Sequence, residues 1–230
     1  MNREKPASGE IYHIFNRGVE KRLIFMDDFD RKRFIDSLYQ FNDTSPVFNF
    51  GHKLTEVRLQ FREREEMVEI MAFALMPNHY HLMVRGITEN GITEFMRKLG
   101  TGYTNYFNAK YQRVGPLFQG KFKATPIKDE RHFLYLPYYI HLNPLDLTDK
   151  KWREQGISNL KKAEKYLASY KWSSHLDYAG EKNFPEIIDK ALLSEIFEST
   201  EQYKKDLLDW VSEENLSEIA DIALEPISEA

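Results

Sequence analysis

The chain has 230 residues, 42% of them hydrophobic, which suffices for one domain with a real core plus an appendage, or for two small domains. It contains no cysteine, which excludes disulfides, thiolate metal sites and cysteine nucleophiles. No apolar run is as long as a membrane span, and the N-terminus is too polar for a secretory signal. We therefore expect a cytoplasmic protein. The net charge of −4 divides into +6 over residues 1–180 and −10 over residues 181–230, and because phosphates repel acids, a nucleic-acid interface belongs to the first part.

The first half of the chain predicts a strand, a helix and a hairpin. Residues 11–17 alternate between apolar and polar side chains, as in a strand. Asp27 or Asp28 can cap a helix that runs to about Phe41. Residues 43–66 predict no clear element, whereas 68–75 and 79–85 are two apolar strands joined at the Pro-Asn pair before residue 79.

The second of these strands begins with His79-Tyr80-His81. Side chains two apart in a strand point to the same face, so His79 and His81 project together. Two neutral imidazoles on one rigid face favour binding of a divalent metal. The alternative for such a pair by itself is two half-exposed histidines with hydrogen-bonded rings.

The segment 95–128 is basic and contains no acidic residue. We expect a helix over 92–112, which begins just before this segment, and a strand over 117–127 inside it. Its aromatic residues are Tyr103, Tyr106, Phe107, Tyr111, Phe118 and Phe122. Cations that follow phosphates, mixed with aromatics that stack on bases, are typical of single-stranded nucleic-acid binding. For any one residue, a solvated helix face with the aromatic turned to the core is the competing interpretation.

Residues 130–142 predict a helix that Asp129 can cap and that ends before Pro144. Tyr139 and Asn143 are four residues apart and therefore share one helix face. A phenol and an amide oxygen one turn apart can both reach an ion held by two histidines of a sheet. Such an ion could polarise a phosphodiester while the phenol attacks phosphorus. An ordinary core aromatic and a helix C-cap are the competing interpretations.

The element order β-α-β-β-α-β predicts an α+β fold, a ferredoxin-like antiparallel sheet with helices on one face, in which the strand of the two histidines is central. We expect a catalytic domain over 1–148 and a tail over 149–180 that docks on the core. We expect residues 181–230 to form an acidic helical extension, with amphipathic helices over 185–197 and 200–210.

Five separated segments resemble the HUH-type single-tyrosine transposases, most closely their REP-associated branch. Met76-Pro77-Asn78-His79-Tyr80-His81-Leu82 resembles the metal-binding motif of that family. Tyr139-Ile140-His141-Leu142-Asn143-Pro144 resembles the segment that holds its nucleophile. The other three segments are 12–19, 115–123 and 170–175, so the resemblance spans roughly residues 8–180.

This resemblance implies that His79 and His81 bind Mg²⁺ or Mn²⁺ with Asn143 or a nearby carboxylate as a third ligand. It implies that Tyr139 cuts single-stranded or hairpin DNA and becomes linked to a 5′ phosphate. The cations that we expect to contact the DNA are Arg17, Arg97, Lys98, Arg113, Lys121 and Lys123. The protein is expected to act as a monomer or a homodimer.

Two other classes of protein remain open at this stage. One is a non-catalytic, transposase-derived DNA-binding regulator, and the other is a zinc or nickel metalloprotein. Loss of a metal histidine or of Tyr139 would indicate the regulator, but all of these residues are present. A covalent adduct between protein and DNA would distinguish the enzyme from both alternatives.

Overall fold

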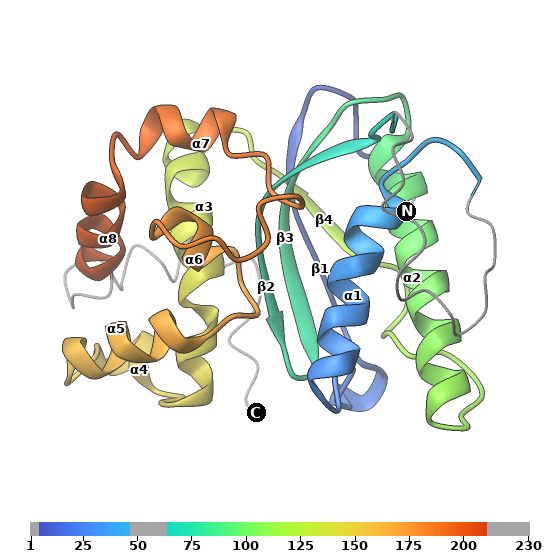
Figure 1. Ribbon diagram of the computed structural model, residues 1–230, viewed down its shortest axis with the longest axis horizontal. Helices are drawn as coiled ribbons and strands as arrows, with labels where there is room; N and C mark the ends of the chain where they lie inside the picture. The colour runs from blue at the N-terminus through green and yellow to red at the C-terminus, as the bar shows by residue number, and fades with distance from the viewer. Residues whose placement is uncertain (1–4, 47–63, 211–230) are drawn as a thin grey trace.

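A computed structural model of the chain describes residues 5–46 and 64–210. Four antiparallel strands form one sheet in the order β2-β3-β1-β4 (Figure 1). The strands are β1, Ile11–Arg17; β2, Val68–Met76; β3, His79–Gly86; and β4, Lys123–Pro126. This order is that of the predicted ferredoxin-like fold, which is confirmed, and β3 with its two histidines is a central strand as predicted.

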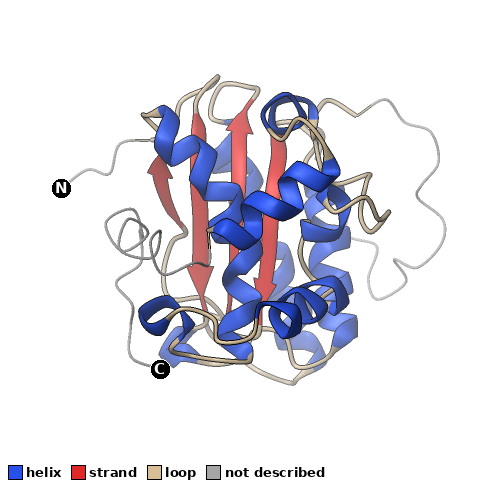
Figure 2. Ribbon diagram, turned by 90° about the vertical axis from the view of Figure 1, so that its left-hand side faces the viewer, coloured by secondary structure: helices blue, strands red, loops and turns tan. Residues whose placement is uncertain are grey.

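Helices cover both faces of the sheet. Their bounds are η1, Val19–Lys21; α1, Asp28–Phe41; α2, Gly91–Lys110; α3, Glu130–Leu142; η2, Asn143–Leu147; α4, Trp152–Gln155; α5, Leu160–Ser169; α6, His175–Tyr178; α7, Ala191–Ile196; and α8, Thr200–Asp209. The prediction of helices on one face is fulfilled by α1 and α2, whereas α3 and the C-terminal helices lie on the opposite face (Figure 1). Figure 2 shows this second face, with helices in front of the strands.

The alternation of side chains along β3 explains why both faces are covered. Tyr80 projects toward α1, where its ring lies 5.0 Å from that of Phe34. His81 projects the other way, toward Tyr139 of α3. Because side chains two apart share a face, His79 lies on the α3 side with His81.

The strand predicted over 117–127 is much shorter in the structure, where only Lys123–Pro126 pairs with β1. Leu117 and Phe118 are adjacent and both buried, so they do not alternate as strand residues do. Gly120 has a φ of +75°, a conformation in which glycine turns the chain. The prediction is therefore wrong over 117–122, where the chain turns before it enters the sheet.

The C-terminal segments pack on α3 and on the edge strand β2. The N–H groups of Leu75 and Phe73 donate to the Trp172 carbonyl at 2.9 Å and the Ser174 hydroxyl at 2.8 Å. The predicted helix at 185–197 begins later, at Ala191. Helix α8 lies against α3, where the rings of Tyr203 and Tyr138 stack. In the described ranges no helix is long and apolar enough to span a membrane.

Candidate active site

Helix α3 presents a polar stripe to the sheet. Asp129 caps the helix by accepting a hydrogen bond from the N–H of His132 at 2.7 Å. His132, Tyr135, Tyr139 and Asn143 follow at intervals of three or four residues, so they lie along one helix face, and all four are buried. Within the described residues, His132 Nε2 and the Tyr135 hydroxyl are buried without a hydrogen-bond partner.

The rings of His79 and His81 lie across from this stripe, with centroids 5.0 Å apart and planes at 89°. His79 Nδ1 lies 2.7 Å from Asn78 Oδ1. A carbonyl oxygen only accepts, so His79 donates from Nδ1 and keeps its lone pair on Nε2. His81 Nδ1 lies 2.9 Å from Nε2 of His13, and His81 Nε2 is buried without a partner in the described part of the chain.

Burial keeps these three imidazoles neutral. Desolvation lowers the pKa of His79 to about 4, opposed by the charge of Asp146 and assisted by that of Arg153. Desolvation also lowers the pKa of His13 to about 3 and that of His81 well below its ordinary value. A metal binds the neutral form of histidine, so at neutral pH these rings need not lose a proton to act as ligands.

Tyr139 lies beside the histidine pair, and Tyr138 does not. The Tyr139 ring is 5.8 Å from the rings of both His81 and His13, edge to face in each case. The Tyr138 hydroxyl instead donates to Asp206 of α8 at 3.2 Å. The structure thus brings together two distant parts of the sequence, Tyr139 of α3 and the histidine pair at the start of β3.

Arg153 of α4 connects Asn143 to Tyr139. Its Nη2 donates to Asn143 Oδ1 at 3.0 Å, and its Nε donates to Asp146 Oδ1 at 3.1 Å. The guanidinium carbon lies 5.0 Å from the Tyr139 ring centroid. Burial opposes the charge, but Asp146 and Tyr139 outweigh it and raise the pKa of Arg153, so it stays cationic. Its Nη1 is buried and has no hydrogen-bond partner among the described residues.

The donor atoms present fit a divalent ion held by two imidazoles and an oxygen. His79 has its lone pair on Nε2, and Nε2 of His81 is buried and unpaired. Asn143 Oδ1 accepts from Arg153, which leaves the second lone pair of that oxygen. In residues 5–46 and 64–210 no cluster of three histidine or carboxylate side chains is arranged to hold a metal, so no carboxylate completes the histidine pair there, and the Asn143 amide is the candidate for a third donor.

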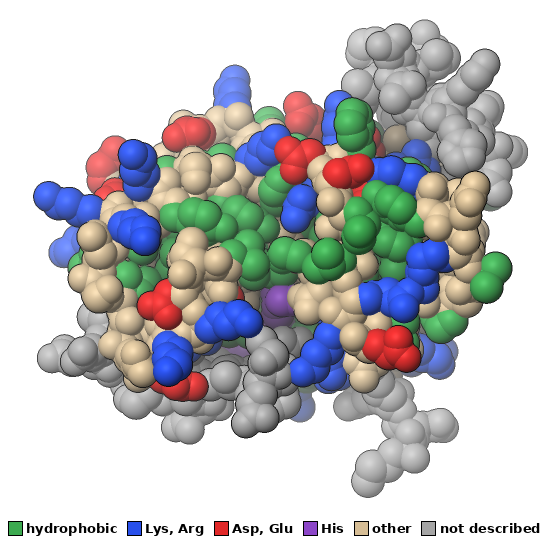
Figure 3. Space-filling model, turned by 90° about the horizontal axis from the view of Figure 1, so that it is seen from below, with side chains coloured by type: hydrophobic (Ala, Val, Ile, Leu, Met, Phe, Trp, Pro, Cys, Tyr) green, Lys and Arg blue, Asp and Glu red, His purple; other side chains and the backbone are tan. Residues whose placement is uncertain are grey.

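Two of the six predicted DNA-binding cations lie on the sheet face of the histidines. Arg17 stands opposite His79 in the strand register, and Phe15 stands between His81 and Lys123. The Lys123 ammonium lies 5.3 Å from the Phe15 ring centroid. The end of the sheet where β3 begins is seen from below in Figure 3, where a histidine shows near the centre with Lys and Arg side chains on both sides.

The other four predicted cations do not lie on this face of the sheet, although Lys121 comes two residues before Lys123. Arg113 and Lys121 are in the connection between α2 and β4. Arg97 pairs with Glu94 on α2, and at 1.5 Å per residue it lies about 20 Å along the helix axis from the C-terminal end. Lys98 donates to two loop carbonyls at 2.6 and 3.0 Å. Arg97 and Lys98 are therefore not brought to the histidine site.

The aromatic residues of the basic segment mainly belong to the core. Tyr103, Phe107 and Phe118 are buried, so the interpretation that they stack on bases is wrong for these three. The amphipathic pattern of α2 directs Tyr103 toward α1, where its ring lies 5.0 Å from that of Phe34. The competing interpretation of core aromatics holds here.

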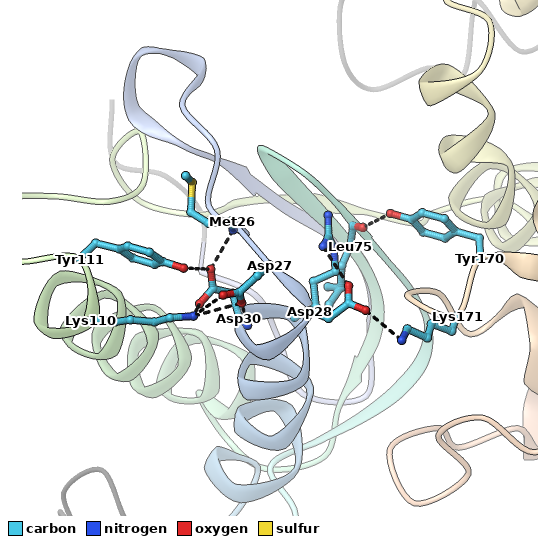
Figure 4. Close-up of polar contacts among 10 residues, drawn as sticks. Met26, Asp27, Asp28, Asp30, Leu75, Lys110, Tyr111, Tyr170 and Lys171 are labelled. Carbon is cyan, nitrogen blue, oxygen red and sulfur yellow. Dashed lines mark hydrogen bonds and ion pairs between the residues drawn. The ribbon is translucent and has the colours of Figure 1, made fainter.

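The buried carboxylate of Asp30 accepts hydrogen bonds from two further aromatics and a lysine of this segment, and Figure 4 shows it with Tyr111 and Lys110. Asp30 accepts from the hydroxyls of Tyr106 and Tyr111 at 2.9 and 2.8 Å and from Lys110 at 2.7 Å. The backbone N–H of Met26 donates to the same group at 2.8 Å. These residues attach α2 to α1 and are used in folding.

Three residues of the site were not predicted from the sequence: His13, Asp146 and Arg153. A histidine in the otherwise apolar stretch Tyr12-His13-Ile14 is only a weak indication of a functional residue. The strand register of β1 and β3 brings it into contact with His81. Asp146 and Arg153 follow the predicted catalytic helix in a segment without clear periodicity. No pattern in the sequence indicates that the chain folds back there onto Tyr139.

The sequence and the fold were compared with known proteins. The family described as IS200-like transposases matches residues 48–143, a range that includes His79, His81, Tyr139 and Asn143. No curated protein sequence matches the chain. A solved structure of a REP-associated tyrosine transposase bound to a REP hairpin is similar with a TM-score of 0.50 and 12% identity, over 83% of this chain and 94% of that one. The predicted resemblance to the single-tyrosine transposases is confirmed by the family match, and the solved structure shows the same fold.

Proposed function

We propose that this protein is a metal-dependent DNA transposase and single-strand endonuclease that forms a covalent phosphotyrosine through Tyr139. The family match supports a DNA-processing function of the transposase type. The observation that supports the finer proposal is the position of Tyr139, whose ring lies against His81 and His13 and beneath the Arg153 guanidinium. A nucleophile beside two imidazoles that can hold a divalent metal suits metal-assisted phosphodiester transesterification.

In the proposed reaction the Tyr139 phenol oxygen attacks the scissile phosphorus and displaces the 3′ oxygen of the preceding nucleotide. The new bond joins Tyr139 to the 5′ phosphate, the phenol proton passes to solvent, and the leaving oxygen takes up a proton to become a free 3′ hydroxyl. The attack conserves one phosphodiester-type bond, so a second 3′ hydroxyl can later reverse the step and join another strand.

The surrounding residues prepare this step. Arg153 places a positive charge over the Tyr139 ring, where it would stabilise negative charge that develops on the phenol oxygen during attack. The unpaired Nη1 of Arg153 can donate to a phosphate oxygen. His79, His81 and Asn143 would hold Mg²⁺ or Mn²⁺, which when bound supplies Lewis-acid polarisation of the phosphate.

The proposed substrate is single-stranded DNA next to a hairpin, as in the REP-associated branch. Arg17 and Lys123 flank the histidine face, and we expect them to contact phosphates. The solved protein of similar fold is described as bound to a REP hairpin, and we extend a hairpin ligand to this chain as part of the proposal.

The test uses a hairpin oligonucleotide with a single-stranded flank, labelled at its 3′ end, and Mn²⁺. A covalent adduct that survives denaturing electrophoresis is expected from the parent protein and from the matched control Tyr138→Phe. Tyr139→Phe should bind the DNA and give no adduct, since it lacks only the attacking oxygen. An adduct from Tyr139→Phe, or none from the parent with any of several hairpins, would favour the DNA-binding regulator instead.

A further inference from the structure

His13 and His81 form a buried imidazole pair between adjacent strands. His13 is diagonal to His81 in the register, since it stands opposite Met83 while His81 stands opposite Phe15. The two ring planes differ by only 16°, their centroids are 5.1 Å apart, and the nitrogens are 2.9 Å apart. The rings therefore meet edge to edge, with the shared proton in the plane of both. Both side chains are fully buried, so water does not compete for this bond.

Only one of the two proton positions leaves His81 able to bind a metal. If His13 donated from Nε2, His81 would carry its own proton on its Nε2, the nitrogen that is buried without a partner. If His81 donates from Nδ1, its Nε2 has a lone pair. That lone pair then matches the one on Nε2 of His79, which Asn78 fixes by accepting from Nδ1.

We propose that His13 is a positioning residue that accepts the Nδ1 proton of His81 and thereby holds the His81 Nε2 lone pair and ring plane ready for a divalent metal. This inference rests on the proposed function, because it assigns a role toward the ion of the same site. A group that accepts the second N–H of a ligating histidine fixes its tautomer and orientation. Here that acceptor is a second imidazole on the neighbouring strand, and Asn78 plays the equivalent part for His79.

His13 lies outside the residues matched by the family comparison, which begin at residue 48. Its other nitrogen, Nδ1, is buried and unpaired in the described structure. In the proposed tautomer this nitrogen carries the proton of His13. The position therefore leaves a buried donor unsatisfied, a cost that a residue with only a packing role would avoid by being apolar.

The first test needs no metal and no variant. Long-range ¹⁵N–¹H correlation spectra of the metal-free, full-length protein distinguish a protonated ring nitrogen from one with a lone pair. We expect His81 to be protonated on Nδ1 and His13 to have its lone pair on Nε2. The reverse pattern, His81 protonated on Nε2, would overturn the proposal whether or not the protein cuts DNA.

The second test measures Mn²⁺ affinity by calorimetry or by electron paramagnetic resonance, without DNA. His13→Phe keeps a ring of similar shape but removes the acceptor, and loss of such a partner typically lowers metal affinity about 10–100-fold. His13→Gln can accept through its amide oxygen and should retain affinity within about threefold. The matched control is His175→Phe, which removes a buried histidine bonded to Tyr203 away from the site, and should bind Mn²⁺ as the parent does.

The outcomes separate the two proposals. Parent-like Mn²⁺ affinity in His13→Phe, with an unchanged melting temperature, would refute the role of His13 alone. Equal losses in His13→Phe and His13→Gln would show that shape and not the acceptor matters, which also overturns it. A parent protein that binds no Mn²⁺ yet protonates His81 on Nδ1 would count against the metal site of the proposed function.

Discussion

On the sheet face covered by α1 and α2, the buried carboxylate of Asp30 accepts from Met26, Lys110 and two tyrosine hydroxyls. On the face covered by α3, buried polar atoms lack partners. In the described ranges, five of the eight such side-chain atoms belong to this site: His13 Nδ1, His81 Nε2, His132 Nε2, the Tyr135 hydroxyl and Arg153 Nη1.

Under the proposed function, the contrast separates polar groups used for folding from polar groups that would bind ligands. The other three unpaired atoms in the described ranges are guanidinium Nε atoms in α1 or just before it, those of Arg22, Arg31 and Arg33. An unpaired buried group costs about 1–3 kcal/mol, so a stable fold keeps such groups few. Their concentration around Tyr139 is therefore informative, because the cost is recovered only when a metal, a phosphate or water binds these atoms. The Asp30 carboxylate instead accepts hydrogen bonds from groups of the protein itself, and its role is to attach α2 to α1 (Figure 4).

The sharpest way to break this comparison is to remove the two ligating nitrogens together. The double variant His79→Leu and His81→Leu should lose Mn²⁺ binding and at least about 10³-fold in cleavage, as expected when Lewis-acid and positioning groups are lost together. Its unfolding free energy should fall by about 1–3 kcal/mol, because His13 and Asn78 lose the hydrogen bonds that they make with His81 and His79, while His81 Nε2 makes none in the fold described. Calorimetric titration and thermal melting measure the two effects; a collapse of stability with retained Mn²⁺ binding would reverse our assignment of the α3 face.

Arg153 tests whether the cation beside Tyr139 serves the reaction. Arg153→Gln retains a donor toward Asn143 but removes the charge over the Tyr139 ring, and we expect about a 10²–10³-fold loss of adduct formation, the size seen for one electrostatic donor. The control is Arg97→Gln, which lies on α2 and pairs with Glu94 away from the site, and should cleave at the parental rate. Single-turnover rates at saturating DNA measure the difference. Equal rates for the two variants would mean that Arg153 only supports the fold.

A change at Asp30, on the face covered by α1 and α2, should lower stability and leave Mn²⁺ binding intact. Asp30→Ala leaves two tyrosine hydroxyls without their acceptor and leaves Lys110 with Asp27 alone, and the loss of these hydrogen bonds to a buried carboxylate costs about 1–3 kcal/mol. Denaturant unfolding should show this loss, while the folded fraction binds Mn²⁺ with parental affinity. A lower affinity at full occupancy of the folded state would show that the two faces are coupled.

Much of this architecture was predictable, because it depends on local patterns. The caps at Asp27 and Asp129 and the His79-Tyr80-His81 alternation all hold in the structure. The burial of Tyr103, the turn at Gly120 and the contact of Arg153 with Asn143 were not predicted. These features depend on which faces meet in three dimensions. The sequence of a helix with aromatic residues does not indicate whether those residues contact bases or pack against another helix.

The smallest expected effect distinguishes cations near the site from cations remote from it. Lys121→Gln with Lys123→Gln removes two positive charges close to the turn at 117–122, and removing one phosphate contact should reduce the slope of log affinity against log salt by roughly 0.7 for single-stranded DNA. Lys98 is already held by two loop carbonyls, so Lys98→Gln is the matched control and should leave the slope unchanged. Fluorescence anisotropy with a labelled hairpin oligonucleotide over a series of salt concentrations measures both. If Lys98→Gln flattened the slope as much as the double variant, DNA would extend along α2, and the binding surface would not be limited to the end of the sheet where β3 begins.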